Sequence, residues 1–262
     1  DNSYAIGQEA AANAPMSYSL GKSATVNTEG DNSYAIGNNA SVSSASGYAI
    51  GTNAKVMSPS GYALGTDARA TGQESYSIGA GAQAIGAQSY AIGRGASTTS
   101  DNAVSIGTSS MAMNNDAYAF GQSAVAAGIE SYAIGKNAKA DSTASYGYAL
   151  GTNAFSSGAN SYAFGQSANT GGDGTNAYAI GTGARANGQE SYAIGRSAGT
   201  ISNNAVSIGT SSMAKNTNAY AFGQSAIAAG IESYAIGKNA KADSTASYGY
   251  AFGQEARSKG PE

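Results

Sequence analysis

The sequence predicts an all-β protein, a parallel β-roll (solenoid) of about 18 coils with repeats of 14 or 16 residues. A four-residue motif, most often Tyr-Ala-Ile-Gly and always ending in Ile, Leu or Phe followed by Gly, recurs 18 times. Of the 17 intervals between its glycines, 13 are 14 residues long and four are 16 residues long. Residues around each glycine alternate as in short strands and are separated by turn formers. Repeats of helix pairs need periods of about 33 to 47 residues, so the period of 14 favours two short strands and two tight turns.

Each repeat begins with a short strand that ends at the glycine, as in residues 33–37. Strand alternation places Tyr34 and Ile36 on one side and Ala35 on the other. The residue before each glycine is always Ile, Leu or Phe, and we expect it to form the core of the coil. The expected core residues are Ile36, Ile50, Leu64, Phe120, Ile134, Phe164, Phe222 and Phe252.

The opposite side of this strand carries only Ser, Ala or Gly, and we expect this flat side to pack on other subunits. The expected trimer-interface residues are Ala35, Ala49, Ala63, Ala133, Ala163 and Ala235. A single thin roll has little core, and three rolls packed side by side supply the missing buried surface. The alternative is that Tyr and Ile point at the partner subunits while the small side chains line the coil.

Two turn residues follow each glycine, and a second alternating run and a Ser/Gly/Asn-rich turn complete the repeat. The second turn residue is often of a type that tolerates a left-handed backbone, as at Asn39, Asn53, Asp67, Gly81, Asn137 and Gly183. Tyrosine fills 16 of the 18 motif positions, with Val104 and Val206 as the exceptions. We expect these rings to form a stacked ladder, because aromatic pairs gain about 0.5–1.5 kcal/mol beyond burial.

The composition excludes several classes of function. The chain has no histidine and no cysteine, which removes His-based triads, the commonest metal ligand, disulfides and thiolate metal sites. A net charge of −3 leaves no basic footprint for nucleic acid, and no apolar run is long enough to span a membrane. The run at residues 171–174 occurs once, whereas calcium-binding glycine repeats need tandem copies. We therefore expect no enzyme activity, no cofactor and no metal site.

Four coils of 16 residues carry a longer turn, at residues 27–32, 141–147, 169–176 and 243–249. Protruding turns are natural recognition points, and an outward position that is elsewhere polar becomes apolar in several coils, which is typical of an interaction patch. The expected partner-binding residues are Met111, Val125, Ile129, Tyr146, Phe155, Met213, Ile227, Ile231 and Tyr248. The alternative is that neighbouring turns or subunits cover these side chains.

Residues 32–40, Asn-Ser-Tyr-Ala-Ile-Gly-Asn-Asn-Ala, resemble the head repeat of YadA-like trimeric autotransporter adhesins. The family motif reads Asn-Ser-Val-Ala-Ile-Gly-x-x-Ser/Ala, and tyrosine replaces its valine in most copies here. The resemblance covers essentially the whole chain. It implies a homotrimer of left-handed parallel β-rolls at the tip of an outer-membrane-anchored fibre on the bacterial surface. It also implies binding to host cell-surface receptors or extracellular matrix proteins.

We expect residues 1–262 to be a single head-domain fragment. We expect this fragment to lack the neck, the stalk, the C-terminal membrane anchor and a signal peptide. The head would then be attached to the membrane only through the missing anchor. Residues 120–151 recur almost unchanged at 222–253, an offset of 102 residues that adds whole coils. Such growth fits a projecting fibre, in which length itself is useful. The alternative is a phage tail fibre or another structural β-solenoid that uses the same repeat.

Overall fold

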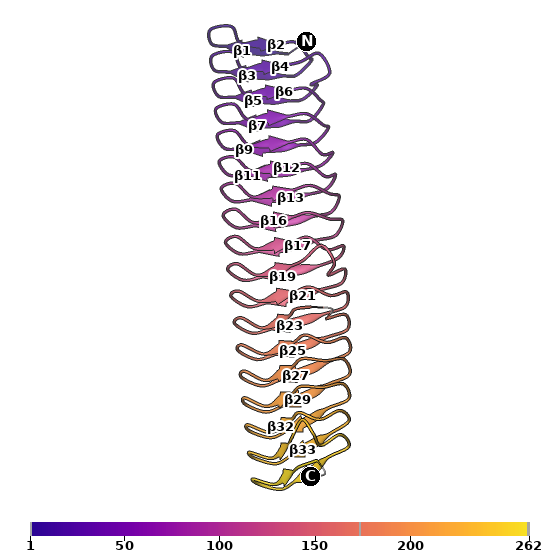
Figure 1. The fold of residues 1–262 in the computed structure, drawn as a ribbon. Helices are drawn as coiled ribbons and strands as arrows, with labels where there is room; N and C mark the ends of the chain where they lie inside the picture. Colours follow the sequence, from indigo (N-terminus) through magenta and orange to yellow (C-terminus); the bar gives the residue numbers. More distant parts are fainter. Residues whose placement is uncertain (1, 173, 261–262) are drawn as a thin grey trace. The chain divides into compact units, whose positions relative to one another are not determined.

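The computed structural model describes residues 2–172 and 174–260, and they form a parallel β-solenoid of about 18 turns, as predicted. Each coil has a three-residue first strand, a glycine turn, a two-residue second strand and a return turn that leads to the next coil (Figure 1). No helix occurs in these residues. The chain divides into two compact units, residues 1–126 and 127–262, and each is described by itself.

The first unit contains strands β1 to β18. Its first strands are β1 (Tyr4–Ile6), β3 (Tyr18–Leu20), β5 (Tyr34–Ile36), β7 (Tyr48–Ile50), β9 (Tyr62–Leu64), β11 (Tyr76–Ile78), β13 (Tyr90–Ile92), β15 (Val104–Ile106) and β17 (Tyr118–Phe120). Its second strands are β2 (Ala11–Ala12), β4 (Thr25–Val26), β6 (Ser41–Val42), β8 (Lys55–Val56), β10 (Arg69–Ala70), β12 (Gln83–Ala84), β14 (Ser97–Thr98), β16 (Met111–Ala112) and β18 (Val125–Ala126).

The second unit contains strands β19 to β36. Its first strands are β19 (Tyr132–Ile134), β21 (Tyr148–Leu150), β23 (Tyr162–Phe164), β25 (Tyr178–Ile180), β27 (Tyr192–Ile194), β29 (Val206–Ile208), β31 (Tyr220–Phe222), β33 (Tyr234–Ile236) and β35 (Tyr250–Phe252). Its second strands are β20 (Lys139–Ala140), β22 (Phe155–Ser156), β24 (Asn169–Thr170), β26 (Arg185–Ala186), β28 (Gly199–Thr200), β30 (Met213–Ala214), β32 (Ile227–Ala228), β34 (Lys241–Ala242) and β36 (Arg257–Ser258).

Consecutive coils within each unit pair in parallel and in register. On β5 and β7, for example, Tyr34 pairs with Tyr48 and Ile36 pairs with Ile50. The backbone N–H of Tyr48 in turn donates to the carbonyl oxygen of Gly61 in the following coil, at 2.9 Å. Because every coil repeats the same residue types, this register places like side chains directly above one another.

The glycine turn requires glycine for two reasons. Gly51 has a φ of +134°, and a Cβ added to it would lie 2.5 Å from the carbonyl oxygen of Gly65 in the next coil. The second turn residue is left-handed, as predicted, with φ of 56° at Asn39, 57° at Asn53 and 58° at Asp67. The side-chain amide of Asn53 also donates to Asp67 Oδ1 at 3.0 Å, so the turn carries a side-chain ladder of its own.

The interior of the coil is built from small residues, and the predicted core is therefore wrong. Ile50, Leu64, Ile134 and Phe252 are 37%, 48%, 39% and 60% exposed. The other expected core residues, Ile36, Phe120, Phe164 and Phe222, are only half-buried. The predicted interface alanines, Ala35, Ala49, Ala63, Ala133, Ala163 and Ala235, are each 0% exposed within the single chain. They line the interior and cannot contact another subunit, so the structure favours the alternative orientation.

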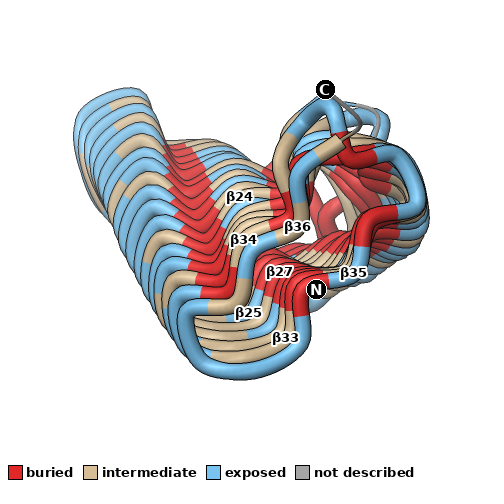
Figure 2. Tube along the Cα trace, turned by 60° about the horizontal axis from the view of Figure 1, so that its bottom comes forward, coloured by how far each residue is buried: buried red, intermediate tan, exposed pale blue. Residues whose placement is uncertain are grey.

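The reason is the thinness of the coil, whose buried positions align from turn to turn in continuous bands (Figure 2). The largest fully buried apolar side chains are Val26, Val42 and Val56. A Cβ at Gly47 would lie 2.5 Å from Val42 Cγ1 and 3.0 Å from Val56 Cγ1, so a valine inside the coil already needs a glycine opposite it. No space remains for an inward Ile, Leu or Phe.

Candidate interaction surfaces

The outward side of the first strands, here called the first-strand face, carries two rows of large side chains. One row holds the motif tyrosines, and the other holds the Ile, Leu or Phe residues before each glycine. The predicted tyrosine ladder is confirmed: the ring centroids of Tyr48 and Tyr62 lie 4.8 Å apart with planes 3° apart, and those of Tyr178 and Tyr192 lie 5.0 Å apart. The ladder is the stacked arrangement that aromatic rings favour.

Grooves run between the two rows of the first-strand face. One groove of about 390 Å³ is lined by Tyr48, Ile50, Tyr62, Ala63, Leu64, Tyr76 and Ile78. A second groove of about 250 Å³ is lined by Tyr4, Ile6, Tyr18, Ser19, Leu20, Tyr34 and Ile36. Their walls are aliphatic and aromatic, and no charged side chain lines either of them. Such a surface fits the side chains of another protein better than a polar ligand.

Burial raises the pKa of Tyr76, and the phenols of Tyr62 and Tyr90 and the carboxylate of Glu74 add to the shift. The pKa of Tyr162 is raised in the same way, by burial and by the phenols of Tyr178 and Tyr148. The raised pKa of Tyr76 and of Tyr162 favours the neutral phenol at these two positions, because a phenolate there loses solvation and lies beside other phenols.

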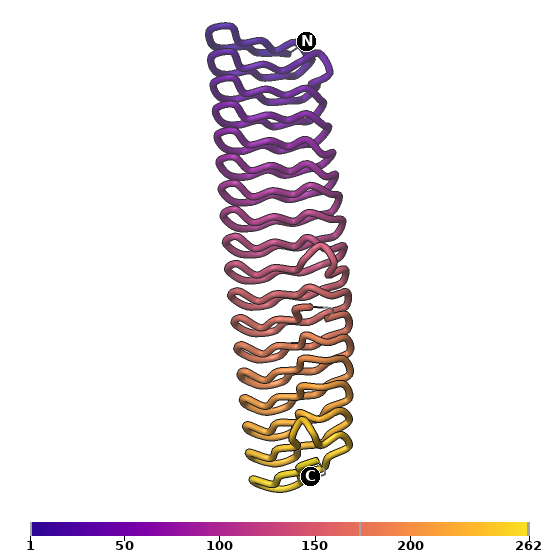
Figure 3. Tube along the Cα trace, in the orientation of Figure 1, coloured from indigo at the N-terminus to yellow at the C-terminus, as the bar shows by residue number. Residues whose placement is uncertain are grey.

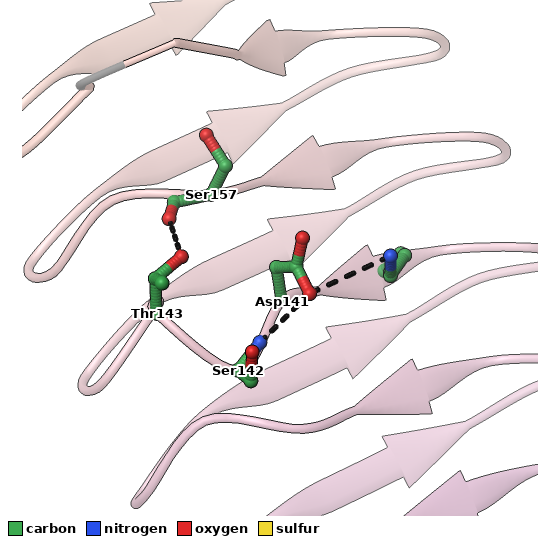
Figure 4. Close-up of polar contacts among 5 residues, drawn as sticks. Asp141, Ser142, Thr143 and Ser157 are labelled. Atoms are coloured by element: carbon green, nitrogen blue, oxygen red, sulfur yellow. Dashed lines mark hydrogen bonds and ion pairs between the residues drawn. The ribbon is translucent and has the colours of Figure 1, made fainter.

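The return turn of residues 141–147 stands out from the otherwise regular trace of the second unit, as does that of residues 243–249 (Figure 3). Asp141 fixes the start of the turn at residues 141–147. Its Oδ1 atom accepts a hydrogen bond from the backbone N–H of Ser142 at 2.8 Å and forms an ion pair with Lys139 Nζ at 3.5 Å (Figure 4). The hydroxyl of Thr143 donates to the carbonyl oxygen of Ser157 in the next coil. These bonds hold the longer turn in one conformation although it protrudes.

Tyr146 and Tyr248, predicted as partner contacts, lie at equivalent places in these two turns. They are 47% and 64% exposed and have φ of 56° and 59°, a conformation that is rare for a bulky residue. Ile129 and Ile231, predicted beside them, are 46% and 49% exposed. The backbone N–H of each tyrosine donates to the carbonyl oxygen of the corresponding isoleucine at 2.9 Å, which brings each pair into adjacent coils.

The remaining predicted contacts point outward from the second strands, which we call the second-strand face. Met111 is 37% exposed and pairs in register with Val125, and Met213 pairs with Ile227. The five predicted residues of this face are Met111, Val125, Phe155, Met213 and Ile227, and all are exposed or half-buried. Lys139 Nζ lies 5.4 Å from the ring centroid of Phe155, so a cation covers this aromatic side chain.

Beside the second strands, sequence reasoning missed four further exposed apolar side chains, at Met57, Ile85, Met113 and Ile201, which are 57%, 44%, 40% and 54% exposed. Each lies two residues after the outward residue of a second strand, on the same side by alternation. That spacing could have identified them. It also assigned the Ile, Leu and Phe row of the first-strand face to the core and gave the outward orientation, which the structure shows, as the alternative.

Metal-binding side chains do not converge in the part of the chain that the structure describes. Among residues 2–172 and 174–260 there is no group of three His, Cys, Asp or Glu side chains able to hold a metal ion. Asp173, in the glycine-rich run considered as a calcium motif, lies outside the described residues. Within the same residues, none of the secondary structure is a helix with the length and apolarity required to cross a bilayer.

A parallel solenoid with the same pattern of outward side chains in every coil is a repeat protein. The description "YadA head domain repeat (2 copies)" belongs to a family profile that matches residues 29–54, 70–89, 84–110, 114–138, 156–175, 173–198 and 214–240. These segments make up more than half of the chain, and the chain therefore belongs to the YadA head repeat family. The resemblance inferred from the sequence is confirmed.

Among solved structures, the chain is similar to the collagen-binding domain of the Yersinia adhesin YadA. The sequences are 24% identical, the TM-score is 0.31, and the alignment covers 57% of this chain and 66% of that chain. The chain thus spans slightly less than two thirds of that domain. A search of curated proteins found no match.

Proposed function

We propose that this chain is part of the head of a homotrimeric adhesin that attaches a bacterium to host cell-surface receptors or extracellular matrix proteins. The observation that carries the proposal is the first-strand face, which is large, apolar and uncovered in the single chain. Leu20, Ile50 and Leu64 are 47%, 37% and 48% exposed. Soluble monomers rarely leave contiguous apolar surface of this kind open, so a partner is expected to cover it.

A second and a third copy of this chain are the partners that fit this face best. The face presents the same two rows in every coil, and neighbouring rings lie 4.8 Å apart across both a 14-residue coil and a 16-residue coil, so a second solenoid with the same rise can match it along its length. Closed cyclic symmetry lets each copy bury its face against its neighbours. The trimeric organisation that the resemblance to YadA-like adhesins implies has this symmetry.

The attachment role is supported by the family and by the surfaces left free when the first-strand face is covered. Turns that protrude from a rigid scaffold are common recognition elements, and the return turns at residues 141–147 and 243–249 present exposed aromatic and aliphatic side chains. The related solved domain is described as binding collagen. We therefore place this chain on the bacterial cell surface, carried by an outer-membrane anchor.

The test combines sizing with a binding screen. Light scattering of the purified chain is expected to give the mass of a trimer at micromolar concentration. The same preparation, applied to immobilised collagen, fibronectin, laminin and epithelial cells, is expected to bind at least one of them. A stable monomer contradicts the proposed assembly. A trimer that binds none of these surfaces contradicts the proposed attachment role.

A further inference from the structure

A pocket of about 270 Å³ lies on the return-turn side of the tyrosine ladder in the second unit. Its lining combines aromatic rings with one carboxylate and one amide. The lining residues are Asn218, Tyr220, Glu232, Tyr234, Tyr248 and Tyr250. It differs from the grooves of the first-strand face, which no charged side chain lines.

Three successive return turns supply the outer wall of the pocket. The backbone N–H of Glu232 donates to the carbonyl oxygen of Thr217 at 3.0 Å, and that of Tyr248 donates to Ile231 at 2.9 Å. Asn218, Glu232 and Tyr248 consequently stand one coil apart, with the carboxylate between the amide and the phenol. We call this line of residues, two positions before each first strand, the return-turn ridge.

The inner wall is the end of the tyrosine ladder. The rings of Tyr220 and Tyr234 are stacked at 4.8 Å, and those of Tyr234 and Tyr250 at 5.1 Å. Burial, the phenols of Tyr220 and Tyr250 and the carboxylate of Glu232 together raise the pKa of Tyr234. The carboxylate of Glu232 lines the same pocket as these phenols and is the one ionised group in its lining.

Tyr248 has a left-handed backbone conformation, which is unfavourable for a bulky residue. Its φ is 59° and its side chain is 64% exposed. A left-handed backbone is unfavourable for a residue with a Cβ, a cost that glycine avoids and asparagine reduces. Other coils place asparagine at this ridge position, at Asn160, Asn204 and Asn218. An exposed ring in a strained conformation is typical of a ligand contact.

The return-turn ridge is acidic and has no cation. At the ridge position and the residue before it, no coil carries Lys or Arg, although the chain has 13 of them. Acidic residues occur there at Asp31, Glu74, Asp101, Asp116, Glu130, Glu190 and Glu232. Within residues 2–172 and 174–260, the ion pairs join Lys139 to Asp141 and Lys241 to Asp243 and do not involve Glu232. The carboxylate in the pocket therefore lacks a positive partner.

The same constellation recurs earlier in the second unit. Glu130, Tyr132, Tyr146 and Tyr148 repeat Glu232, Tyr234, Tyr248 and Tyr250 at an offset of 102 residues. The rings of the first ladder pair, Tyr132 and Tyr148, are stacked at 4.8 Å, and the ridge tyrosine again has a φ of 56°. The duplication thus preserved both the carboxylate and the strained aromatic residue.

We propose that each of these two places binds the cationic side chain of an arginine or lysine on a partner protein. The carboxylate of Glu232 or Glu130 pairs with the cation, and the ring of Tyr248 or Tyr146 covers it, because aromatic faces attract cations most strongly when solvent is displaced. This inference rests on the proposed attachment role. The protein to which the head attaches would present a basic segment that lies along the return-turn ridge.

The test is calorimetric titration of the full chain with a peptide of alternating glycine and arginine, and with the same peptide carrying citrulline in place of arginine. Citrulline keeps the shape and the planar donor group of arginine but lacks its charge. We expect two sites per chain for the arginine peptide and binding at least about tenfold weaker for the citrulline peptide. The double variant Glu130→Gln/Glu232→Gln is expected to lose about tenfold in affinity for the arginine peptide. Equal affinity for both peptides, or no loss in the double variant, overturns the proposal.

Two further variants separate binding from folding. Tyr146→Asn/Tyr248→Asn installs the residue that other ridge positions use, so we expect unchanged or higher thermal stability together with weaker peptide binding. Glu190→Gln is the matched control, because the next coil carries Asn204 and Val206 at the ridge and ladder positions, and it should leave binding unchanged. Neutral oligosaccharides that bind in a Tyr248-dependent manner, while the arginine peptide does not, also overturn the proposal.

The matrix-binding assay distinguishes this inference from the attachment role itself. A wild-type trimer that binds the arginine peptide but attaches to no matrix protein or cell contradicts the proposed function and leaves the pocket assignment intact. A Glu130→Gln/Glu232→Gln trimer that attaches as well as wild type overturns the pocket as the contact used in attachment and leaves the adhesin role intact.

Discussion

The two outward faces of the coil are built on the same parallel ladders but tolerate different residues. On the first-strand face, every coil presents Tyr or Val followed by Ile, Leu or Phe. On the second-strand face, the corresponding row includes Lys55, Arg69, Met111, Phe155 and Gly199. Parallel pairing continues along both faces, so backbone geometry does not explain the difference. The difference fits the proposed trimer, because a face that packs on copies of itself must be uniform, whereas a face in solvent is free to vary.

The largest expected effect comes from charging the uniform face. The triple variant Ile50→Lys/Leu64→Lys/Ile78→Lys places three ammonium groups along one groove, and burying unpaired charges in an interface costs several kcal/mol for each. We expect the trimer to dissociate to monomers in light scattering. The β-sheet circular dichroism of the isolated chain should remain, because these side chains lie outside its core.

The matched control for this variant lies on the variable face. Lys55→Ser/Arg69→Ser removes two exposed charges and should leave the trimer and its melting temperature within error of wild type. A triple-lysine variant that remains trimeric contradicts the assignment of the first-strand face to the interface.

A smaller but still severe effect is expected from the backbone that both faces share. Gly51→Ala forces a side chain into a φ of +134° and against the carbonyl oxygen of Gly65, at a cost of about 3 kcal/mol. Urea unfolding followed by circular dichroism measures the loss. Gly199→Ala is the control: an added Cβ there meets nothing within 4 Å, and its effect should stay within about 0.5 kcal/mol. Equal unfolding midpoints for the two variants argue against an obligatory glycine turn.

The sequence was sufficient for the period, the parallel pairing, the left-handed turn residues and the tyrosine ladder, because each follows from residue spacing or from backbone preference. It did not determine which side of the first strand faces inward. Alternation shows that Tyr34 and Ile36 share a side opposite Ala35, but either side could be the interior. That choice depends on the thickness of the coil, which is a tertiary property.

One feature of the sequence does indicate the thickness. The inward valines of two consecutive second strands, Val42 and Val56, are each followed five residues later by a glycine, Gly47 and Gly61. Those glycines avoid contact with the valine side chains, which indicates that the interior admits little more than a valine. The pocket at Glu232 was missed for a different reason: its ridge residues are local turn formers, and only their register across coils brings them together.

Alkaline pH is expected to weaken the tyrosine-bearing face selectively, since no second strand contains tyrosine. Burial first, and then the phenols of Tyr62 and Tyr90, raise the pKa of Tyr76 above its ordinary value of 10.0. The folded chain therefore holds the phenolic proton more tightly than the unfolded chain. Stability is fully present below about pH 10 and is lost as pH rises through the folded-state pKa.

Melting temperatures measured from about pH 8 to about pH 11 test this linkage. They should be flat at first and then fall, and phenolate absorbance should develop later for the folded chain than for the chain in denaturant. Tyr76→Phe removes one ionising group and should reduce the decline. Superimposable titration curves for folded and denatured chains contradict the raised pKa.

The smallest effect is expected on the variable face, from removal of its paired cation. Lys139 lies 3.5 Å from Asp141, with side chains 47% and 35% exposed, and 5.4 Å from the Phe155 ring centroid. Exposed pairs of this kind contribute about 0.5 kcal/mol, so Lys139→Met should lower the unfolding free energy by no more than that, and added salt should remove the difference. Asp141→Asn keeps an oxygen that can accept the Ser142 N–H and isolates the charge. A loss above about 2 kcal/mol for Lys139→Met would mean that the second-strand face is also buried in the assembly, and the contrast between a uniform interface and a variable solvent face would fail.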